Sequence, residues 1–185
     1  MSIPRTWLAG AGVSVATAAL LAVPAAPAGA AAAQQAAPPS LRQLTLRLAS
    51  DAEQLAEVKG ASVDDGAAIV QGAFSFGGSA RWTAEDMGGG YVRFASVHSG
   101  KCLDVKNGDT AEETEIIQWT CDTGHHQQWR FVAKGNGYQL VARHSGKCLN
   151  VRGGTGEGNP LIQYTCSSQG EDNDLWLPVW EPTTV

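Results

Sequence analysis

Two runs of acidic residues are the first candidates for chemistry in this sequence, Glu112-Glu113-x-Glu115 and Glu171-Asp172-x-Asp174. Closely spaced carboxylates can catalyse glycoside hydrolysis or ligate calcium. Acids in polar loops are usually solvated, so we expect neither role. The two histidines at 125 and 126 are adjacent rather than at a metal-ligand spacing, and neither a Gly-x-Ser-x-Gly nor a His-Glu-x-x-His motif is present. We therefore predict no catalysis, no metal ion and no cofactor.

An internal repeat is the feature that organises the chain. The stretch His-Ser-Gly-Lys-Cys-Leu-Asp-Val at 98–105 returns as His-Ser-Gly-Lys-Cys-Leu-Asn-Val at 144–151. Trp82, Trp129 and Trp176 follow one another at intervals of 47 residues, which indicates a third, degenerate copy before the first clear one. A large apolar residue in every copy is expected in a symmetric core. The predicted lobes are 44–89, 90–135 and 136–182.

The four cysteines are expected to form disulfides if the chain is exported. Sequence alone allows three pairings, but the repeat places Cys102 and Cys121 in one lobe and Cys148 and Cys166 in the next. We therefore predict the bonds Cys102–Cys121 and Cys148–Cys166. By the loop-entropy argument, each would contribute about 3 kcal/mol. Zinc binding is the alternative, but the sequence contains no Cys-x-x-Cys spacing.

The expected secondary structure is all-β. Short segments rich in strand-forming residues, such as 138–142 and 161–165, are separated by Gly- and Ser-rich turn signals. Residues 48–58 contain good helix formers, but their spacing matches the strand segments of the other lobes, so we predict strands there as well. Strand alternation assigns Leu103 to the core and leaves Asp104 near the surface. Short strands at regular spacing predict a closed barrel or a sandwich.

The N-terminus has a different composition from the repeat. Arg5 is the single charge in residues 1–40, and it precedes an apolar run of about 17 residues. Such a run is short for a membrane span, and small residues follow it. We predict a signal peptide over 1–30, cleaved near Ala30 or Ala33, a flexible linker over 31–43 and a folded domain over 44–182. After cleavage we expect no membrane attachment.

The net charge limits the choice of partners. The formal charge is −5, and it becomes −6 once Arg5 is removed with the signal peptide. A mildly acidic surface disfavours nucleic acid and anionic membranes as partners.

The motifs of the second lobe carry a family resemblance. Cys-Leu-Asp-Val at 102–105, an aromatic residue two positions before a second cysteine, and Gln-x-Trp at 127–129 resemble the lobe pattern of ricin B-chain-like β-trefoil lectins, also called family-13 carbohydrate-binding modules. The Ala-rich signal and freestanding module resemble exported actinobacterial proteins. The resemblance implies an all-β β-trefoil of twelve strands in three pseudo-symmetric lobes, with one shallow sugar pocket possible per lobe.

This resemblance assigns site residues in the second lobe. Asp104 matches the acceptor for sugar hydroxyls, Trp119 matches the stacking platform, and His126 and Gln127 stand where the family usually has Asn-Gln. A carboxylate, an aromatic face and an amide are what binding of a neutral sugar requires. His126 departs from the pattern, and a histidine contact is expected to depend on pH. The alternative is that Asp104 stabilises a turn and Trp119 is an ordinary strand residue.

The third lobe matches the same pattern with changes. Asn150 replaces the aspartate, Tyr164 supplies the platform, and Asn173 and Asp174 stand at the amide positions after a two-residue insertion. Asp174 is expected to restore a carboxylate from the opposite wall. In the first lobe, Gly72 removes the platform, so we expect no sugar site there.

We therefore expect a secreted, extracellular, monomeric and non-catalytic lectin. Its partner would be a carbohydrate of the galactose, xylose or mannose type, and the sequence does not choose among them. The first alternative is a β-trefoil that binds proteins or inhibits a protease, since the fold supports such functions too. A small glycosidase ranks third, because the repeat occupies the whole mature chain.

Overall fold

The computed structural model describes residues 42–74 and 78–181, and the predicted signal peptide lies outside them. Every regular element in the described ranges is a β-strand or a short 3-10 turn. Strand β1 begins at Arg42 and therefore includes the last two residues of the predicted linker. None of the helical turns in the described ranges has the length and apolar character needed to cross a membrane.

Each lobe contributes four strands, as the family resemblance implies. Residues 48–58, despite their helix formers, supply the end of β1 and all of β2. The strands of lobe 1 are β1 (Arg42–Leu48), β2 (Gln54–Val58), β3 (Ile69–Ala73) and β4 (Trp82–Asp86). Those of lobe 2 are β5 (Val92–Ser96), β6 (Cys102–Val105), β7 (Ile116–Trp119) and β8 (Trp129–Lys134). Those of lobe 3 are β9 (Gly137–Ala142), β10 (Cys148–Val151), β11 (Leu161–Tyr164) and β12 (Trp176–Trp180). The 3-10 turns are η1 (Lys59–Ala61), η2 (Gly78–Ala80), η3 (Lys106–Gly108) and η4 (His125–Gln127).

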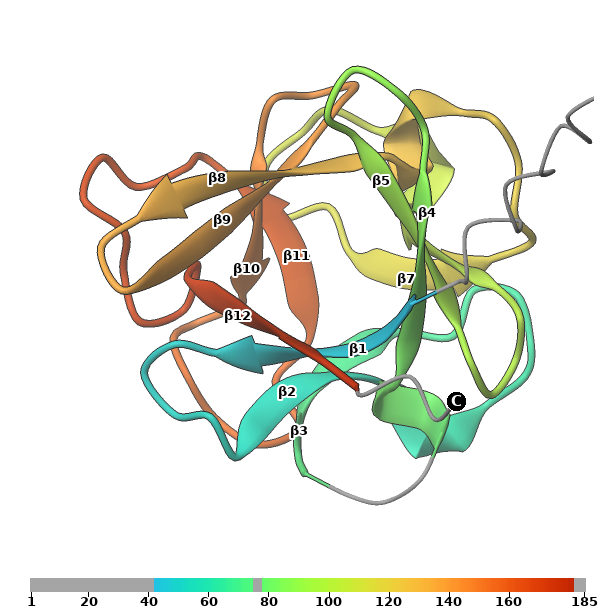
Figure 1. The fold of residues 1–185 in the computed structure, drawn as a ribbon, viewed down its shortest axis with the longest axis horizontal. Coiled ribbons are helices and arrows are strands. Elements are labelled where there is room, and N and C mark those ends of the chain that lie inside the picture. Colours follow the sequence, from blue (N-terminus) through green and yellow to red (C-terminus); the bar gives the residue numbers. More distant parts are fainter. Residues whose placement is uncertain (1–41, 75–77, 182–185) are drawn as a thin grey trace, which may run out of the picture. The chain divides into compact units, whose positions relative to one another are not determined.

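The four strands of each lobe form two pairs, one in a barrel and one in a hairpin. The first and fourth strands of the lobes pair in the order β1, β4, β5, β8, β9, β12 and back to β1, which closes an antiparallel barrel. The second and third strands form the hairpins β2–β3, β6–β7 and β10–β11. Figure 1 shows the three lobes around a common centre, from blue-green through yellow to red. The predicted β-trefoil is confirmed.

The three hairpins share one register and touch one another. Cys102 pairs with Trp119, Cys148 pairs with Tyr164, and Leu55, which stands at the position of these cysteines in lobe 1, pairs with Gly72. Isolated bridges then join neighbouring hairpins, namely Ala68 to Ile117, Val70 to Pro160 and Glu115 to Ile162. Equivalent residues of the lobes can therefore be compared directly.

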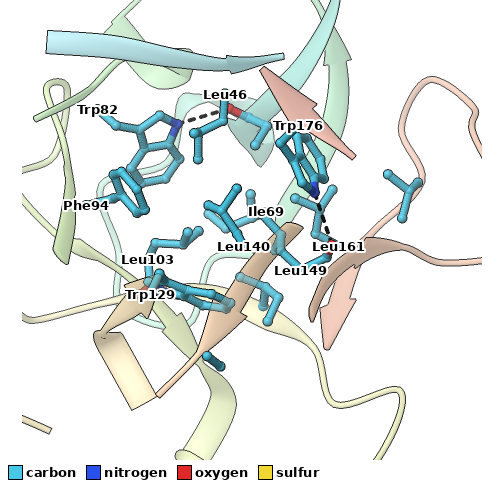
Figure 2. Packing of buried hydrophobic residues seen from close by; sticks show 14 of the residues in the cluster. Leu46, Ile69, Trp82, Phe94, Leu103, Trp129, Leu140, Leu149, Leu161 and Trp176 are labelled. Carbon is cyan, nitrogen blue, oxygen red and sulfur yellow. Dashed lines mark hydrogen bonds between the residues drawn. The ribbon is translucent and has the colours of Figure 1, made fainter. Parts of the chain in front are cut away.

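The three tryptophans lie in the core, as predicted. Trp82, Trp129 and Trp176 are fully buried, and their indole N–H groups donate to backbone carbonyls of β2, β6 and β10 at 3.0–3.2 Å. Figure 2 shows the three rings around a centre that is filled by aliphatic side chains such as Leu140 and Ile69. Burying a large apolar side chain contributes about 1.5–3 kcal/mol, and the hydrogen bond satisfies the one polar atom of each indole.

Both disulfides lie within lobes 2 and 3. Cys102 at the start of β6 bonds Cys121, and Cys148 at the start of β10 bonds Cys166. Each bond therefore ties the beginning of a hairpin to the segment that follows its second strand, which is where Trp119 or Tyr164 ends the hairpin.

Candidate functional site

A hollow of about 280 Å³ lies on lobe 2 beside the end of its hairpin. Strand β6 contributes Asp104, strand β7 ends at Trp119, and turn η4 contributes His126. The hollow thus brings together three of the four residues predicted for lobe 2. Its lining consists of Asp104, Asn107, Ile117, Trp119, Asp122 and His126.

Asp104 is more deeply buried than strand alternation predicts. Only 2% of its surface is exposed, so the expectation that it lies near the surface is wrong. The reason is that η4 packs over the outer face of β6, so all four residues of this strand are buried. A two-faced strand pattern cannot reveal that a turn more than twenty residues later covers the second face. The carboxylate still forms part of the wall of the hollow.

The surroundings of Asp104 favour its neutral form. Burial raises the pKa of Asp104 to about 6, and the charge of Asp122 adds to the increase, whereas the hydrogen bond from Gln127 and the neighbouring His126 act in the opposite direction. His126 Nε2 lies 3.4 Å from Asp104 Oδ2 and 3.7 Å from Asp122 Oδ2. The imidazole therefore bridges two carboxylates at the edge of the hollow. Gly124 leaves room for this arrangement, because a Cβ at this position would overlap the imidazole ring and displace it.

Gln127 lies behind Asp104 instead of facing the hollow. Its Nε2 donates to Asp104 Oδ2 at 2.7 Å and to the Thr120 carbonyl at 3.1 Å, and its Oε1 accepts from the Asp122 N–H at 2.9 Å. Gln127 is fully buried. With these three bonds the amide holds the carboxylate in place and leaves Asp104 Oδ1 without a hydrogen bond among the described residues.

Trp119 supplies the aromatic wall. It is the last residue of β7, and 45% of its surface is exposed although it is a large apolar side chain. The ring lies close to Gly66 of the preceding lobe, whose backbone has φ of +83°. An exposed indole that is held at the end of a hairpin offers a flat face for the C–H side of a sugar ring.

Two polar lining residues were not identified from the sequence. Asn107 adopts φ of +59° in η3, directly after β6, and Asp122 follows the second cysteine of the disulfide. The Asn-Gly pair at 107–108 signals a turn, and the position next to Cys121 is one place beyond the motif that defines the lobe. Both signals identify loops but not the direction in which the side chains point.

A larger hollow of about 390 Å³ lies on lobe 3 and includes all four residues predicted for that lobe. Tyr164 is 39% exposed at the end of β11, as Trp119 is at the end of β7. Asn173 Nδ2 donates to Asn150 Oδ1 at 3.0 Å and to the Val151 carbonyl at 3.2 Å. The Asn150 oxygen is thus already engaged, and its Nδ2 is the group without a hydrogen bond among the described residues.

Asp174 does not offer the free carboxylate that we expected from it. It is 1% exposed and accepts four hydrogen bonds, from Gln139 Nε2 at 2.9 Å, Ser167 N–H at 3.0 Å, Ser167 Oγ at 2.7 Å and Glu171 N–H at 2.7 Å. It occupies the place of Gln127 and, like that residue, braces the loop behind the hollow. Glu171, which donates its N–H to Asp174, also lines this hollow.

The hairpin of lobe 1 differs from the other two at the platform position. Gly72 stands opposite Leu55 at the platform position. The carboxylate of Glu57 occupies the space that a Cβ at residue 72 would require. Ser79 and Ala80, which stand where His126 and Gln127 stand in lobe 2, are both buried. The acid of lobe 1 therefore fills the platform site instead of facing an aromatic side chain.

Comparison with protein families agrees with this geometry. The family described as "Ricin-type beta-trefoil lectin domain-like" matches residues 42–119, 79–164 and 125–184. The three overlapping matches together span the strands of all three lobes.

Solved structures with the same fold include a designed protein, an enzyme and a fungal agglutinin. The designed threefold-symmetric protein ThreeFoil is 40% identical, with a TM-score of 0.70 over 74% of this chain and 97% of that one. An exo-β-1,3-galactanase from Clostridium thermocellum is 32% identical, with a TM-score of 0.71 over 77% of this chain but only 31% of the galactanase chain. The Rhizoctonia solani agglutinin is 21% identical, with a TM-score of 0.67 over 78% of this chain and 100% of the agglutinin, and shows the fold alone.

Proposed function

Because this chain belongs to the ricin-type β-trefoil lectin domain-like family, we propose that it is a secreted, non-catalytic lectin that binds neutral sugar units through lobes 2 and 3. One observation carries the proposal. The buried carboxylate of Asp104, which Gln127 holds by a hydrogen bond, lines the same hollow as the exposed ring of Trp119. Carboxylate acceptors and an aromatic face are the groups that recognise the two sides of a pyranose ring.

Each polar or aromatic residue of the lobe 2 hollow has a specific role in this proposal. Asp104 Oδ1 accepts hydroxyl protons of the sugar, since Oδ2 is occupied by Gln127. Trp119 stacks against the apolar face of the ring. Asn107 and His126 line the hollow and complete the hydrogen-bond network. Because the carboxylate is already oriented before the sugar arrives, little side-chain entropy is lost on binding.

Lobe 3 provides a weaker site, in which a hydrogen-bond donor replaces the acceptor of lobe 2. Asn150 offers its free Nδ2 as a donor, and Tyr164 offers a smaller aromatic face than an indole. A neutral hydrogen bond in place of a charged one weakens binding by about 1–2 kcal/mol. A single shallow site of this kind has a dissociation constant in the millimolar range, which corresponds to a binding free energy of about −4 kcal/mol. Firm attachment would therefore need a polymer that engages both lobes at once.

Export of the chain is supported by two features. Two disulfides are compatible with an extracellular protein, because such bonds persist in oxidising compartments. The charge-poor, apolar N-terminus matches a cleaved signal peptide. The galactanase that shares the fold is about three times longer than the matched part, and its activity is not transferred to this chain.

The test is retention on immobilised polysaccharides, with galactan, xylan and mannan as the three probes. Asp104→Asn keeps the shape of the side chain and removes the charged acceptor, and we expect it to reduce retention strongly. Asp86→Asn is the matched control, because Asp86 is an exposed acid at the end of β4 that lines none of the hollows described above. Elution by the matching free monosaccharide supports a lectin. Retention that free sugar does not release would contradict sugar recognition, and no retention on any of the three polysaccharides would favour the protein-binding alternative. Equal retention of Asp104→Asn and the control would contradict the assigned site.

A further inference from the structure

The boundary between lobes 1 and 2 is fastened by a set of polar contacts. His98 Nε2 lies 3.0 Å from the carbonyl oxygen of Ala61. Lys101 Nζ lies 2.8 Å from Asp65 Oδ1, and Thr120 Oγ1 donates to Asp65 Oδ2 at 3.0 Å. The acid in the lobe 1 loop is thus held by an ammonium group and a hydroxyl of lobe 2, and we call this set the boundary latch.

The boundary between lobes 2 and 3 repeats the latch with equivalent side chains. His144 Nε2 lies 2.9 Å from the Asp109 carbonyl oxygen. Lys147 Nζ lies 3.9 Å from Glu112 Oε1, and the Thr165 hydroxyl donates to the same carboxylate. The equivalence follows from position: Asp65 and Glu112 stand four residues before β3 and β7, and Lys101 and Lys147 directly precede β6 and β10.

The boundary between lobes 3 and 1 retains the acid of the latch but none of its partners. Glu157 stands four residues before β11, in the position of Asp65 and Glu112. The position of the lysine holds Gln54, that of the histidine holds Asp51, and that of the threonine holds Ala73. Glu157 is exposed and forms no ion pair with any described residue. An acid that two other lobes use to bind an ammonium group is therefore left without its cation.

A cleft opens where this latch is missing. Its volume is about 230 Å³, and its walls include Asp51, Gln54 and Gln71 of lobe 1 and the segment 155–157 of lobe 3. The floor is well ordered by hydrogen bonds, because Gln71 Nε2 donates to Gln54 Oε1 at 3.0 Å and Gln71 Oε1 accepts from the Gly156 N–H at 2.8 Å. We call this hollow the lobe 3–lobe 1 cleft.

The cleft continues into the sugar hollow of lobe 3. A shallow hollow between them is lined by Thr155, which also lines the cleft, and by Asn173, which also lines the hollow at Tyr164. Glu171 and Asp172 form its outer wall, and Ser50 Oγ donates to the Asp172 carbonyl at 3.0 Å, which ties this wall to lobe 1. Neighbouring hollows therefore lead from Tyr164 to Glu157.

The charge along this path is negative. Burial raises the pKa of Glu57 above its usual range, and the charge of Glu157 raises it further, so these two carboxylates lie close enough to repel each other. Asp51 and Asp172 are exposed along the same path, and neither forms an ion pair with a described residue. The cationic side chain along these hollows, Arg152, lines the lobe 3 hollow and donates to the Glu113 carbonyl at 2.7 Å.

We propose that the lobe 3–lobe 1 cleft is a binding site for the ammonium group of an amino sugar, within an oligosaccharide whose neighbouring unit occupies the hollow at Asn150 and Tyr164. This inference rests on the proposed lectin function and adds the ligand class of lobe 3. The ligand's ammonium takes the place that Lys101 and Lys147 occupy beside the equivalent acids. Thr155 and Gln54 remain available for hydroxyl groups of the same unit.

The test compares two tetrasaccharides that differ in charge, the glucosamine tetramer and the fully N-acetylated tetramer. Calorimetric titration is done in the Asp104→Asn background, so that lobe 3 dominates, and at a mildly acidic pH that keeps the amines protonated. We expect the glucosamine tetramer to bind about three- to fivefold more tightly at low ionic strength, as for one partly exposed ion pair. This preference should shrink at high ionic strength because of screening.

Two variants identify the cleft as the source of the preference. Glu157→Gln removes the acid, and Gln54→Lys supplies an internal ammonium as in the other lobes, so each should abolish the preference. Glu53→Gln is the matched control, because Glu53 is an exposed acid of lobe 1 that does not line the cleft. Equal affinity for the two tetramers, or a preference that survives in both cleft variants, would overturn the inference. Failure of the lectin proposal is distinguished by neutral monosaccharides, which would then bind neither lobe.

Discussion

Asp104→Asn should make the protein more stable at neutral pH while weakening its sugar site. The side chain is 2% exposed, and burial raises its pKa from 3.8 to about 6. The charged form of this group is therefore less stable in the folded state than in the unfolded state. Asparagine keeps the shape and retains an oxygen that can accept the hydrogen bond from Gln127.

The size and the sign of the effect follow from proton linkage. Because the folded state binds the proton more tightly than the unfolded state, the free energy of unfolding falls as the pH rises from about 4 to about 6, and it is constant above this range. A pKa difference of about two units corresponds to about 2–3 kcal/mol at pH 7. The asparagine variant does not ionise at this position, so its free energy of unfolding does not fall in this way. At pH 7 it should exceed that of the natural protein by up to about 2–3 kcal/mol.

Urea unfolding of both proteins between pH 4 and pH 8 would measure the effect. The two stabilities should be similar near pH 4, diverge as the pH rises toward about 6, and differ by a constant amount above it. The raised pKa of Glu57 and the lowered pKa values of Asp65 and Glu115 act equally in both proteins and cancel in the difference. Parallel pH profiles, or an asparagine variant that is less stable at pH 7, would refute the reasoning.

Trp119→Ala should abolish sugar binding in lobe 2 but change the unfolding free energy by less than about 1 kcal/mol, because the ring is 45% exposed; calorimetric binding and urea unfolding check the two halves. Binding in lobe 2 should weaken as the pH falls through about 6 and Asp104 is protonated, whereas binding at Asn150 in lobe 3 should not follow this titration; NMR titrations at several pH values separate the lobes. Trp129→Phe should lower the unfolding free energy by about 2–3 kcal/mol, because it removes buried volume and leaves the Leu103 carbonyl without its donor; urea unfolding that shows no loss would contradict this.

The repeat allowed the fold to be predicted in some detail. The 47-residue spacing of Trp82, Trp129 and Trp176 placed them in the core, and the structure confirms this placement together with the all-β architecture. The pairing of the cysteines followed from the same spacing, because a local hairpin brings both members of a pair together. Periodic features of this kind are determined by the chain locally and are therefore visible in the sequence.

The site was predicted less completely, because it depends on how loops fold over strands. Asp104 was expected near the surface, but η4 buries it and changes its pKa. Gln127 and Asp174 were expected to face a sugar, yet both form their hydrogen bonds with neighbouring protein groups and stabilise the loop behind the hollow. Asn107 and Asp122 line the hollow although no motif marks them. Side-chain direction in irregular segments is a tertiary property, which spacing along the chain does not encode.

The central claim is that lobes 2 and 3 each hold one sugar and lobe 1 holds none. NMR titration with a neutral monosaccharide, such as methyl galactoside, tests it most directly through the indole signal of Trp119 and the backbone amides around Tyr164 and Gly72. We expect saturable shifts at Trp119, weaker saturable shifts at Tyr164, and none at Gly72, where the carboxylate of Glu57 occupies the platform position. Saturable shifts around Gly72, or none at Trp119 with any of the galactose, xylose and mannose glycosides, would contradict it.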